Sequence, residues 1–293
     1  MSSPNLPFQH LIITRFNLKV TSTSSVIDAL WTRDRENREV QTEQWLKERF
    51  NLFEAFCLPS VVNQTEKDFK WLVYFDENTP EAYKQKISKW ETDLEFFTPI
   101  YKPSYNHFMK EINQDIKAYS PNKPYIITTR LDNDDSLHTE ASLTIKDHFI
   151  PVHNTPINLA KGYCFNLNSE NKIQIITTLT LKDGPFVSLI EQTDKALGVY
   201  NKKHGDYLNI SSTIQIQERP LWAQIIHEGN MVNFMRGSVK RISDIESDFG
   251  VSNKLLNFQS FKEIKHQVRH ILRLLIPLKL RMAIFNFLNK SND

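Results

Sequence analysis

The sequence predicts an α/β protein whose mainly parallel, Rossmann-like sheet is covered by helices. Over the first 150 residues, short apolar runs rich in β-branched or aromatic residues alternate with segments of helical periodicity. Such an order supplies the crossover helices that parallel strands need. With 40% hydrophobic residues in 293, the chain can also bury a sizeable core.

Four strands and three helices are predicted in this part. The strands cover 10–16, 71–75, 94–101 and 125–131, and Pro99 makes the third an edge strand. The helices cover a segment from Glu43 that Pro59 weakens or ends, a segment from Pro80 to Glu91, and 107–118. The first helix has an apolar stripe at helical spacing: Leu46, Phe50, Phe53 and Cys57.

The pattern loosens after residue 150. Segments 162–167 and 173–181 indicate strands, which we expect to form an antiparallel pair, and 186–197 indicates a helix. From Phe261 the chain is basic with helical spacing. We therefore expect one domain over 1–255, followed by a helical tail over 256–293.

Charge and cysteine usage narrow the class of protein. The net charge of +2 argues against a nucleic-acid binder. The segment 261–290 holds seven Lys or Arg and one Glu, a local +6 that leaves about −4 for the rest. The two cysteines, Cys57 and Cys164, favour a reducing, cytoplasmic compartment. We find neither a signal peptide nor an apolar window long enough to span a membrane.

The segment RLDNDD (130–135) follows the fourth predicted strand. Ligands of open α/β sheets bind outside the carboxyl ends of the strands. Asp132 and Asp134 point to the same side of an extended segment and repel each other unless a cation lies between them. Their oxygens suit Mg²⁺ or Mn²⁺, and Asp135 could join them.

Other interpretations of this cluster compete with a metal site. A solvated acidic turn is the general alternative. An EF-hand loop fails, because Leu137 and Leu143 stand where Gly and Glu are required. A pair of hydrolytic carboxylates stays open.

Glycine-rich phosphate-binding motifs are missing from the sequence, which has only seven glycines. A phosphate-binding protein of this composition would use arginine side chains and a carboxylate-held cation instead. Arg15 after the first strand and Arg130 beside the acidic cluster are the candidates, with a plain surface role as the alternative.

A family resemblance adds to these inferences. The segment 53–80, with its VVNQT turn and the strand WLVYFD, resembles the opening of family-two glycosyltransferases, and RLDNDD falls at the position of their DXD motif. The strings WLKERFNLFEAFCLPSVVNQT, WLVYFDENTP, TTRLDNDDSLH, GPFVSLIE and WAQIIHEGN resemble the rhamnosyltransferase family of bacterial GT-A proteins more closely. They cover most of the chain from Trp45 to Asn230.

The resemblance implies transfer of a sugar, rhamnose by the family label, from a UDP- or dTDP-sugar to an acceptor hydroxyl. Asp76 is expected to contact the nucleoside base, and the donor site is expected to comprise Thr14, Arg15, Asp76, Arg130, Asp132 and Asp134. A Mn²⁺ or Mg²⁺ ion would stabilise charge on the leaving diphosphate as a Lewis acid. Its expected ligands are Asp132, Asp134, Asp135 and His227.

The catalytic base is less well marked, because the ED pair that family-two enzymes usually carry is missing. A carboxylate is needed to deprotonate the acceptor in an inverting enzyme. The candidates are Asp183, Glu191 and Asp206, each with a solvated surface acid as the alternative. His204 is a candidate for acceptor binding.

The tail and the acceptor give the last expectations. Apolar and basic residues of 261–290 fall on separate helical faces, which suits an anionic membrane surface, with core packing as the alternative. A glycan or lipid-linked acceptor in bacterial surface polysaccharide or glycolipid synthesis, at the cytoplasmic face of the inner membrane, would fit such a tail. His266 and His270 have zinc-ligand spacing, but no third ligand accompanies them. A hydrolase with the same carboxylates and a non-catalytic glycan-binding protein are the rival functions.

Overall fold

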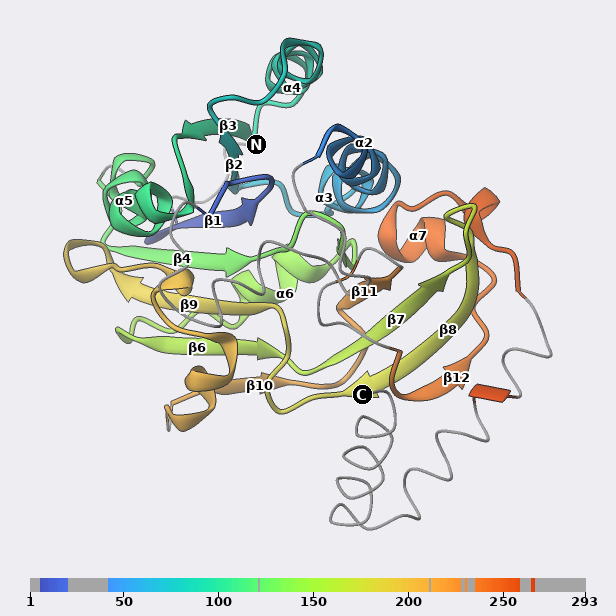
Figure 1. Cartoon of the computed structure of the whole chain (residues 1–293). Helices are drawn as coiled ribbons and strands as arrows, with labels where there is room; N and C mark the ends of the chain where they lie inside the picture. Colours follow the sequence, from blue (N-terminus) through green and yellow to red (C-terminus); the bar gives the residue numbers. More distant parts are fainter. Residues whose placement is uncertain are drawn as a thin grey trace, which may run out of the picture.

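The computed structural model describes residues 6–20, 42–120, 122–210, 212–227, 230, 235–258 and 265–266, which form two sheets (Figure 1). The larger has the order β10-β6-β9-β4-β1-β2-β3 and the smaller the order β12-β8-β7-β11-β5. The larger comprises β1 (Phe8–Arg15), β2 (Lys70–Asp76), β3 (Phe97–Lys102), β4 (Tyr125–Arg130), β6 (Thr155–Leu159), β9 (Val187–Gln192) and β10 (Ile214–Ile216). The smaller comprises β5 (Ser136–Leu137), β7 (Lys161–Leu167), β8 (Ile173–Thr180), β11 (Trp222–Ile226) and β12 (Ser238–Lys240).

The centre of the larger sheet is parallel, as predicted. β1 lies between β2 and β4 and is parallel to both, and β3 is parallel to β2 at the edge. The four strands predicted in this part are present, and Pro99 lies in the edge strand. The mainly parallel α/β fold class is therefore confirmed.

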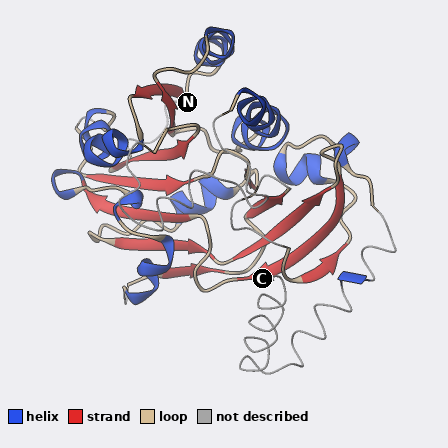
Figure 2. Ribbon diagram, viewed as in Figure 1, coloured by secondary structure: helices blue, strands red, loops and turns tan. Residues whose placement is uncertain are grey.

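Helices cover both faces of this sheet (Figure 2). Alternate residues of β1 face opposite sides: Ile12 belongs to one apolar cluster, whereas Leu11 and Ile13 belong to another. The first cluster includes side chains of α2 (Glu43–Leu52), α4 (Glu81–Asp93) and α6 (Ala141–Asp147). The second includes side chains of α5 (Tyr105–Ala118). Burial on both faces explains why the strands are continuous apolar runs.

The first predicted helix does not end at Pro59. α2 leads into a π-helical turn, η1 (Phe53–Cys57), and then into α3 (Leu58–Val62). A proline inside an α-helix removes one hydrogen bond and clashes with the preceding turn. Here the amide of Leu58 reaches back to the carbonyl of Phe53, so the wider turn directly before Pro59 absorbs the change of register.

A second correction concerns 186–197, which is not a helix. Residues 187–192 form β9, which pairs antiparallel with both β4 and β6, and only a single 3₁₀ turn, η2 (Thr193–Lys195), follows. Val187 and Leu189 belong to one apolar cluster and Ile190 to the other. Because β9 is buried on both faces, Ser188 and Glu191 are buried together with its apolar residues, and the sequence does not show the alternation that marks a strand.

The smaller sheet packs against α7 (Ile245–Phe249). The 3₁₀ turn η5 (Asn253–Leu255) follows α7 along the chain. In the smaller sheet, β7 and β8 form the antiparallel pair that the sequence predicts. The 3₁₀ turns η3 (Val199–Asn201) and η4 (His204–Asn209) follow β9. Most of the predicted 256–293 tail, including His270, lies outside the described residues. Within the part of the chain that is described, no helix is long and apolar enough to cross a membrane.

Candidate functional site at the carboxyl edge of the sheet

Three strands bring charged side chains to one edge of the larger sheet. β1 ends at Arg15, β2 at Asp76 and β4 at Arg130, and these strands are parallel neighbours. Their carboxyl ends therefore meet at the same edge, where open α/β sheets bind ligands. The acidic segment 132–135 continues from β4 at this edge.

The acidic segment is tied to strands on both sides of it. The amide of Leu131 donates to the carbonyl of Ile13, and Asn133 Nδ2 donates to the carbonyl of Phe16 at 2.7 Å. On the other side, Asp135 Oδ1 accepts the amide of Ile225 at 2.7 Å. The segment thus bridges β1 of the larger sheet and β11 of the smaller one.

Three side chains converge on a single oxygen of Asp134. Arg49 NH1 lies 2.6 Å from Asp134 Oδ2, His227 Nε2 lies 3.0 Å from it, and Asn230 Nδ2 lies 3.5 Å from it. Burial raises the pKa of Asp134, but the Arg49 guanidinium and the hydrogen bond to His227 outweigh this and hold the net pKa well below its usual range. Asp134 is therefore ionised although it is buried.

The two neighbouring carboxylates lie in different surroundings. Burial raises the pKa of Asp135, and the charges of Asp134 and Asp132 raise it further. Its Oδ2 is buried and makes no hydrogen bond. The side chain of Asp132 is 33% exposed, and Arg130 lies 3.4 Å from its Oδ1. The three neighbouring acids thus titrate differently, because burial and like charge favour the neutral form of Asp135 whereas the cation Arg49 favours the ionised form of Asp134.

Asp134 and His227 have a spacing that fits a divalent cation. Two neighbouring ligands at right angles, each about 2.1 Å from an ion, are themselves about 3.0 Å apart, which is the separation of Asp134 Oδ2 and His227 Nε2. Mg²⁺ typically takes one or two carboxylates and completes its shell with substrate phosphates. Among the described residues no group of three potential metal ligands comes together, so a cation held by Asp134 and His227 would complete its shell with oxygens of a bound ligand.

Two arginines flank one buried tyrosine beside this site. The guanidinium carbon of Arg15 lies 5.0 Å from the ring centroid of Tyr200, and that of Arg130 lies 5.1 Å from it. Arg15 also lies 5.4 Å from the ring of Tyr105. The negative faces of the rings hold two cations that would otherwise repel each other. The guanidinium groups of this Arg15–Arg130 pair therefore both pack on the ring of Tyr200 at the carboxyl edge of the sheet.

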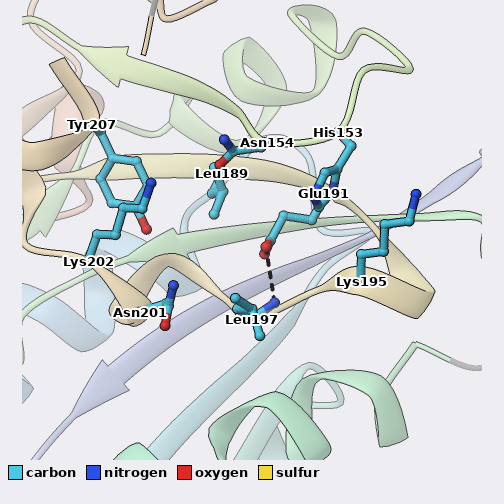
Figure 3. A pocket seen from close by; sticks show the side chains of 9 residues that line it. All are labelled: His153, Asn154, Leu189, Glu191, Lys195, Leu197, Asn201, Lys202 and Tyr207. Atoms are coloured by element: carbon cyan, nitrogen blue, oxygen red, sulfur yellow. Dashed lines mark hydrogen bonds between the residues drawn. The ribbon is translucent and has the colours of Figure 1, made fainter. Parts of the chain in front are cut away.

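The segment that carries Tyr200 is held by side chains of the sheet. Glu191 accepts the amides of Leu197 and Gly198 at 3.0 and 2.9 Å, the first of which Figure 3 shows. The amide of Val199 donates to Thr128 Oγ1 at 2.9 Å. Gly198 has φ +84° at the centre of this turn, a conformation that glycine adopts without strain.

This placement assigns Glu191 a role different from the predicted catalytic base. Glu191 is 3% exposed, and both its carboxylate oxygens accept backbone amides. Glu191 pairs with Ile126 near the start of β4. Asp132 lies six residues after Ile126, which corresponds to about 20 Å along the strand direction. The structure does not bring Glu191 to the acidic segment.

A cavity of about 220 Å³ lies beside Glu191 (Figure 3). The lining of this cavity does not include Arg15, Arg130 or a carboxylate of the acidic segment. Its walls are His153, Asn154, Leu189, Glu191, Lys195, Leu197, Asn201, Lys202 and Tyr207.

The other two candidate bases lie close to each other. Asp183 is exposed in the loop before β9, and because β9 is antiparallel to β4, this loop lies at the carboxyl edge of β4. A Cβ built on Gly205 would lie 4.0 Å from Asp183 Oδ2, so the segment with His204 and Asp206 adjoins Asp183. Asn158 fixes the Asp183 loop, because its Oδ1 accepts the amide of Gly184 at 2.9 Å.

Two predicted donor-binding residues are used within the protein. Thr14 is fully buried and its hydroxyl accepts the indole N–H of Trp71 at 2.9 Å, so its side chain cannot reach a ligand at the edge. Asp76 is 7% exposed at the predicted strand end, and its oxygens accept the amides of Asn78 and Lys19. Asp76 thus orders the turn after β2 and the segment after β1.

Three residues of the site escaped the sequence analysis: Arg49, Tyr200 and Asn230. Arg49 lies in a helix more than 80 residues from its partner Asp134, and Tyr200 lies in an irregular segment. No local periodicity connects such positions. Asn230 lies in the segment WAQIIHEGN, of which the sequence indicates only His227 as a candidate. The Oδ1 atom of Asn230 accepts the amide of His227 at 2.7 Å.

The fold is a mainly parallel sheet with helices on both faces and charged groups at its carboxyl edge, where α/β proteins bind ligands. A family model described as "Putative rhamnosyl transferase" matches residues 9–238. The chain belongs to this family. A search of the curated proteins returned no match.

A search of the solved structures returned matches of low identity and low TM-score. S. aureus TarS 1–349 in complex with UDP is 12% identical, with a TM-score of 0.40 over 74% of this chain and 60% of that one. The same fragment with UDP-GlcNAc gives 12% identity and a TM-score of 0.41, covering 76% and 60%. A putative nucleotide-diphospho-sugar transferase from Desulfovibrio desulfuricans G20 gives 8% and 0.34, covering 76% and 82%. The chain thus spans 60% of the TarS fragments it matches.

Proposed function

We propose that this protein is a glycosyltransferase that moves a sugar, rhamnose by the family name, from a nucleotide-diphospho-sugar to an acceptor hydroxyl at the carboxyl edge of the larger sheet. The observation that carries the proposal is the meeting of the Arg15–Arg130 pair with the ionised Asp134 at one edge. A diphosphate needs cations, and the leaving diphosphate gains charge as the glycosidic bond breaks. The site supplies both fixed arginines and ionised oxygens that suit a bound cation.

The Arg15–Arg130 pair binds the donor diphosphate in this proposal. Guanidinium groups bind phosphate oxygens through paired hydrogen bonds. Tyr200 keeps both groups oriented before the donor arrives, so less side-chain freedom is lost on binding. Asp76 lies on the same edge at the end of β2, and in our proposal its carboxylate, which already accepts two backbone amides, also accepts a hydrogen bond from the nucleoside base of a dTDP- or UDP-sugar.

Asp134, His227 and Asp132 would hold a Mn²⁺ or Mg²⁺ ion next to that diphosphate. When bound, such an ion supplies Lewis-acid stabilisation of the negative charge on the leaving oxygen. Before an ion binds, the protein's own part is to keep Asp134 ionised and turned toward His227, which the contacts with Arg49 and Asn230 achieve. The proposal fits the DXD-type motif that Asp132 and Asp134 form.

Asp183 is the base in this proposal. It is exposed, lies at the carboxyl edge and is followed by a loop that Asn158 fixes. The acceptor oxygen attacks the anomeric carbon, the bond to the diphosphate oxygen breaks with its electron pair leaving on the nucleoside diphosphate, and the hydroxyl proton passes to Asp183. Such a single displacement inverts the anomeric centre.

The test compares Asp183→Asn with Asp206→Asn, the neighbouring acid in the adjoining segment. General-base catalysis contributes about 10²–10⁴-fold, so Asp183→Asn should lower turnover by that factor with an unchanged donor KM. Asp206→Asn should turn over like the wild type. The assay follows transfer from dTDP-rhamnose and from UDP-sugars to a panel of glycan and lipid-linked acceptors by mass spectrometry. Equal effects of the two variants would contradict the assignment.

The same assay separates transfer from the rival functions. A hydrolase would release free sugar from the donor at the same rate with and without acceptor. A glycan-binding protein would bind acceptor without consuming donor. A role in surface polysaccharide or glycolipid assembly, with the 261–290 tail on an anionic membrane, stays a prediction from the sequence. Flotation of the full chain with anionic vesicles at low salt tests it.

A further inference from the structure

Arg49 occupies the position that a divalent cation would take beside Asp134. Its NH1 is 2.6 Å from Asp134 Oδ2, the same oxygen that faces His227. The side chains of Arg49, Asp134 and His227 are 11%, 10% and 9% exposed, so water screens them little. The oxygen best placed to bind a metal is therefore already paired with a protein cation.

The turns η1 and α3, which continue directly from the α2 helix of Arg49, are fixed to β5, which directly follows the acidic segment. Ser136 Oγ donates to the carbonyl of Phe56 in the π-helical turn at 3.0 Å. The amide of Leu137 donates to Ser60 Oγ at 3.1 Å. Arg49 also lies 5.3 Å from the ring of Trp45, one turn earlier in α2. These contacts fix the backbone of Arg49 relative to Asp134 and leave only its side chain able to withdraw.

A metal ion and the Arg49 guanidinium exclude each other at this oxygen. An ion about 2.1 Å from Asp134 Oδ2 would lie within a few ångströms of a guanidinium that is 2.6 Å from the same atom. Both are positively charged, and the site is nearly closed to water, so their repulsion is strong. Arg49 therefore opposes metal binding at Asp134 Oδ2 as long as it stays on that atom.

We propose that Arg49 is the counter-ion of Asp134 in the donor-free enzyme, that a divalent metal binds by displacing it, and that the donor diphosphate receives the displaced guanidinium. Arg49 then couples the two ligands: metal alone binds weakly because Arg49 must give up its partner, whereas donor and metal together satisfy every charge. By linkage, the donor must strengthen metal binding by the same factor as metal strengthens donor binding. This inference rests on the proposed function for the identity of the donor.

The test measures Mn²⁺ affinity by calorimetry, with free Mn²⁺ followed by electron paramagnetic resonance, for the wild type, Arg49→Met and Arg49→Gln. Arg49→Lys keeps the charge, and Arg219→Met, whose arginine pairs with Glu140 at the surface, is the matched control. Both neutral variants should bind Mn²⁺ alone about tenfold or more tightly than the wild type. Arg49→Lys and Arg219→Met should stay near the wild type. Adding Asp134→Asn to Arg49→Gln should remove the gain.

Nucleotide then tests the coupling. Saturating UDP or dTDP should raise the Mn²⁺ affinity of the wild type by at least as large a factor as the Arg49→Gln substitution does without nucleotide. The same nucleotides should raise the Mn²⁺ affinity of Arg49→Gln much less. Unchanged or weaker Mn²⁺ binding by both neutral variants would overturn the inference even where nucleotide still binds. Tighter Mn²⁺ binding by the variants in a protein that binds no nucleotide would support the displacement and overturn the donor assignment instead.

Discussion

The two ends of β4 carry buried acids with opposite roles. At the carboxyl end, Asp134 is ionised and shares one oxygen with a guanidinium, an imidazole and an amide. At the amino end, Glu191 on the neighbouring β9 has its two oxygens bound by two backbone amides. Burial raises the pKa of Glu191, although those amides lower it. Asp134 is held by side chains, which can be exchanged for other partners, whereas Glu191 is held by backbone amides.

The difference teaches that the residue type does not decide what a buried acid does. Backbone amides cannot leave Glu191 without unfolding the turn at 197–199, so this acid serves structure. The partners of Asp134 are side chains, which a ligand can replace. A variant that replaces the acid with its amide should therefore harm chemistry at one end and stability at the other.

Asp134→Asn should show the largest effect. It keeps the shape of the side chain but removes the charge that pairs with Arg49 and suits a cation. We expect turnover to fall by about a hundredfold to a thousandfold, the range for losing one group that stabilises transition-state charge. Steady-state kinetics with saturating donor and Mn²⁺ measures it, with circular dichroism as the check on folding. A folded Asp134→Asn that turns over like the wild type would remove the distinction between the two ends.

Arg130→Gln should have the next largest effect, because it removes one cation of the Arg15–Arg130 pair. A charge-assisted hydrogen bond contributes about 1.5–3 kcal/mol, so the donor KM should rise roughly tenfold to a hundredfold. Nucleotide competition binding measures the same loss without turnover. Arg219→Gln, at the surface, is the control. Donor affinity equal to that of the wild type would place the diphosphate elsewhere.

Glu191→Gln should reduce stability rather than turnover. The amide group can accept only one of the two backbone N–H groups, and leaving one buried donor without a partner costs about 1–3 kcal/mol. Urea unfolding measures this fall in the free energy of unfolding. Turnover should change little at a temperature where the variant is folded. A collapse of turnover with intact stability would restore Glu191 as a candidate base.

The pH dependence of that stability change gives the smallest effect. Because burial raises the pKa of Glu191 in the folded protein, the folded state binds the proton more tightly than the unfolded state does. The contribution of Glu191 to stability is therefore greatest below its unfolded pKa and declines as the pH rises through the folded value. Glutamine does not titrate, so the destabilisation by Glu191→Gln should be largest at acid pH and shrink toward neutrality. Urea unfolding of both proteins at several pH values checks the sign.

Much of the larger sheet could be predicted from the sequence, because its strands are short apolar runs separated by amphipathic helices. The acidic segment was also predictable, since Asp132 and Asp134 directly follow such a run. The strand at 187–192 was not, because a run buried on both faces lacks alternation. Arg49 and Tyr200 were not either, because only the packing of distant segments brings them to Asp134 and to the two arginines.

The bond from Ile225 to Asp135 has a consequence for how the site is made. The acidic segment is synthesised well before β11, whose Ile225 holds Asp135. At about 5–20 residues per second, several seconds of synthesis separate Asp135 from Ile225. During that interval the nascent chain carries three neighbouring acids whose final neighbours, His227 and Asn230 among them, have not yet been translated. The binding site is therefore one of the last parts of the described chain to mature.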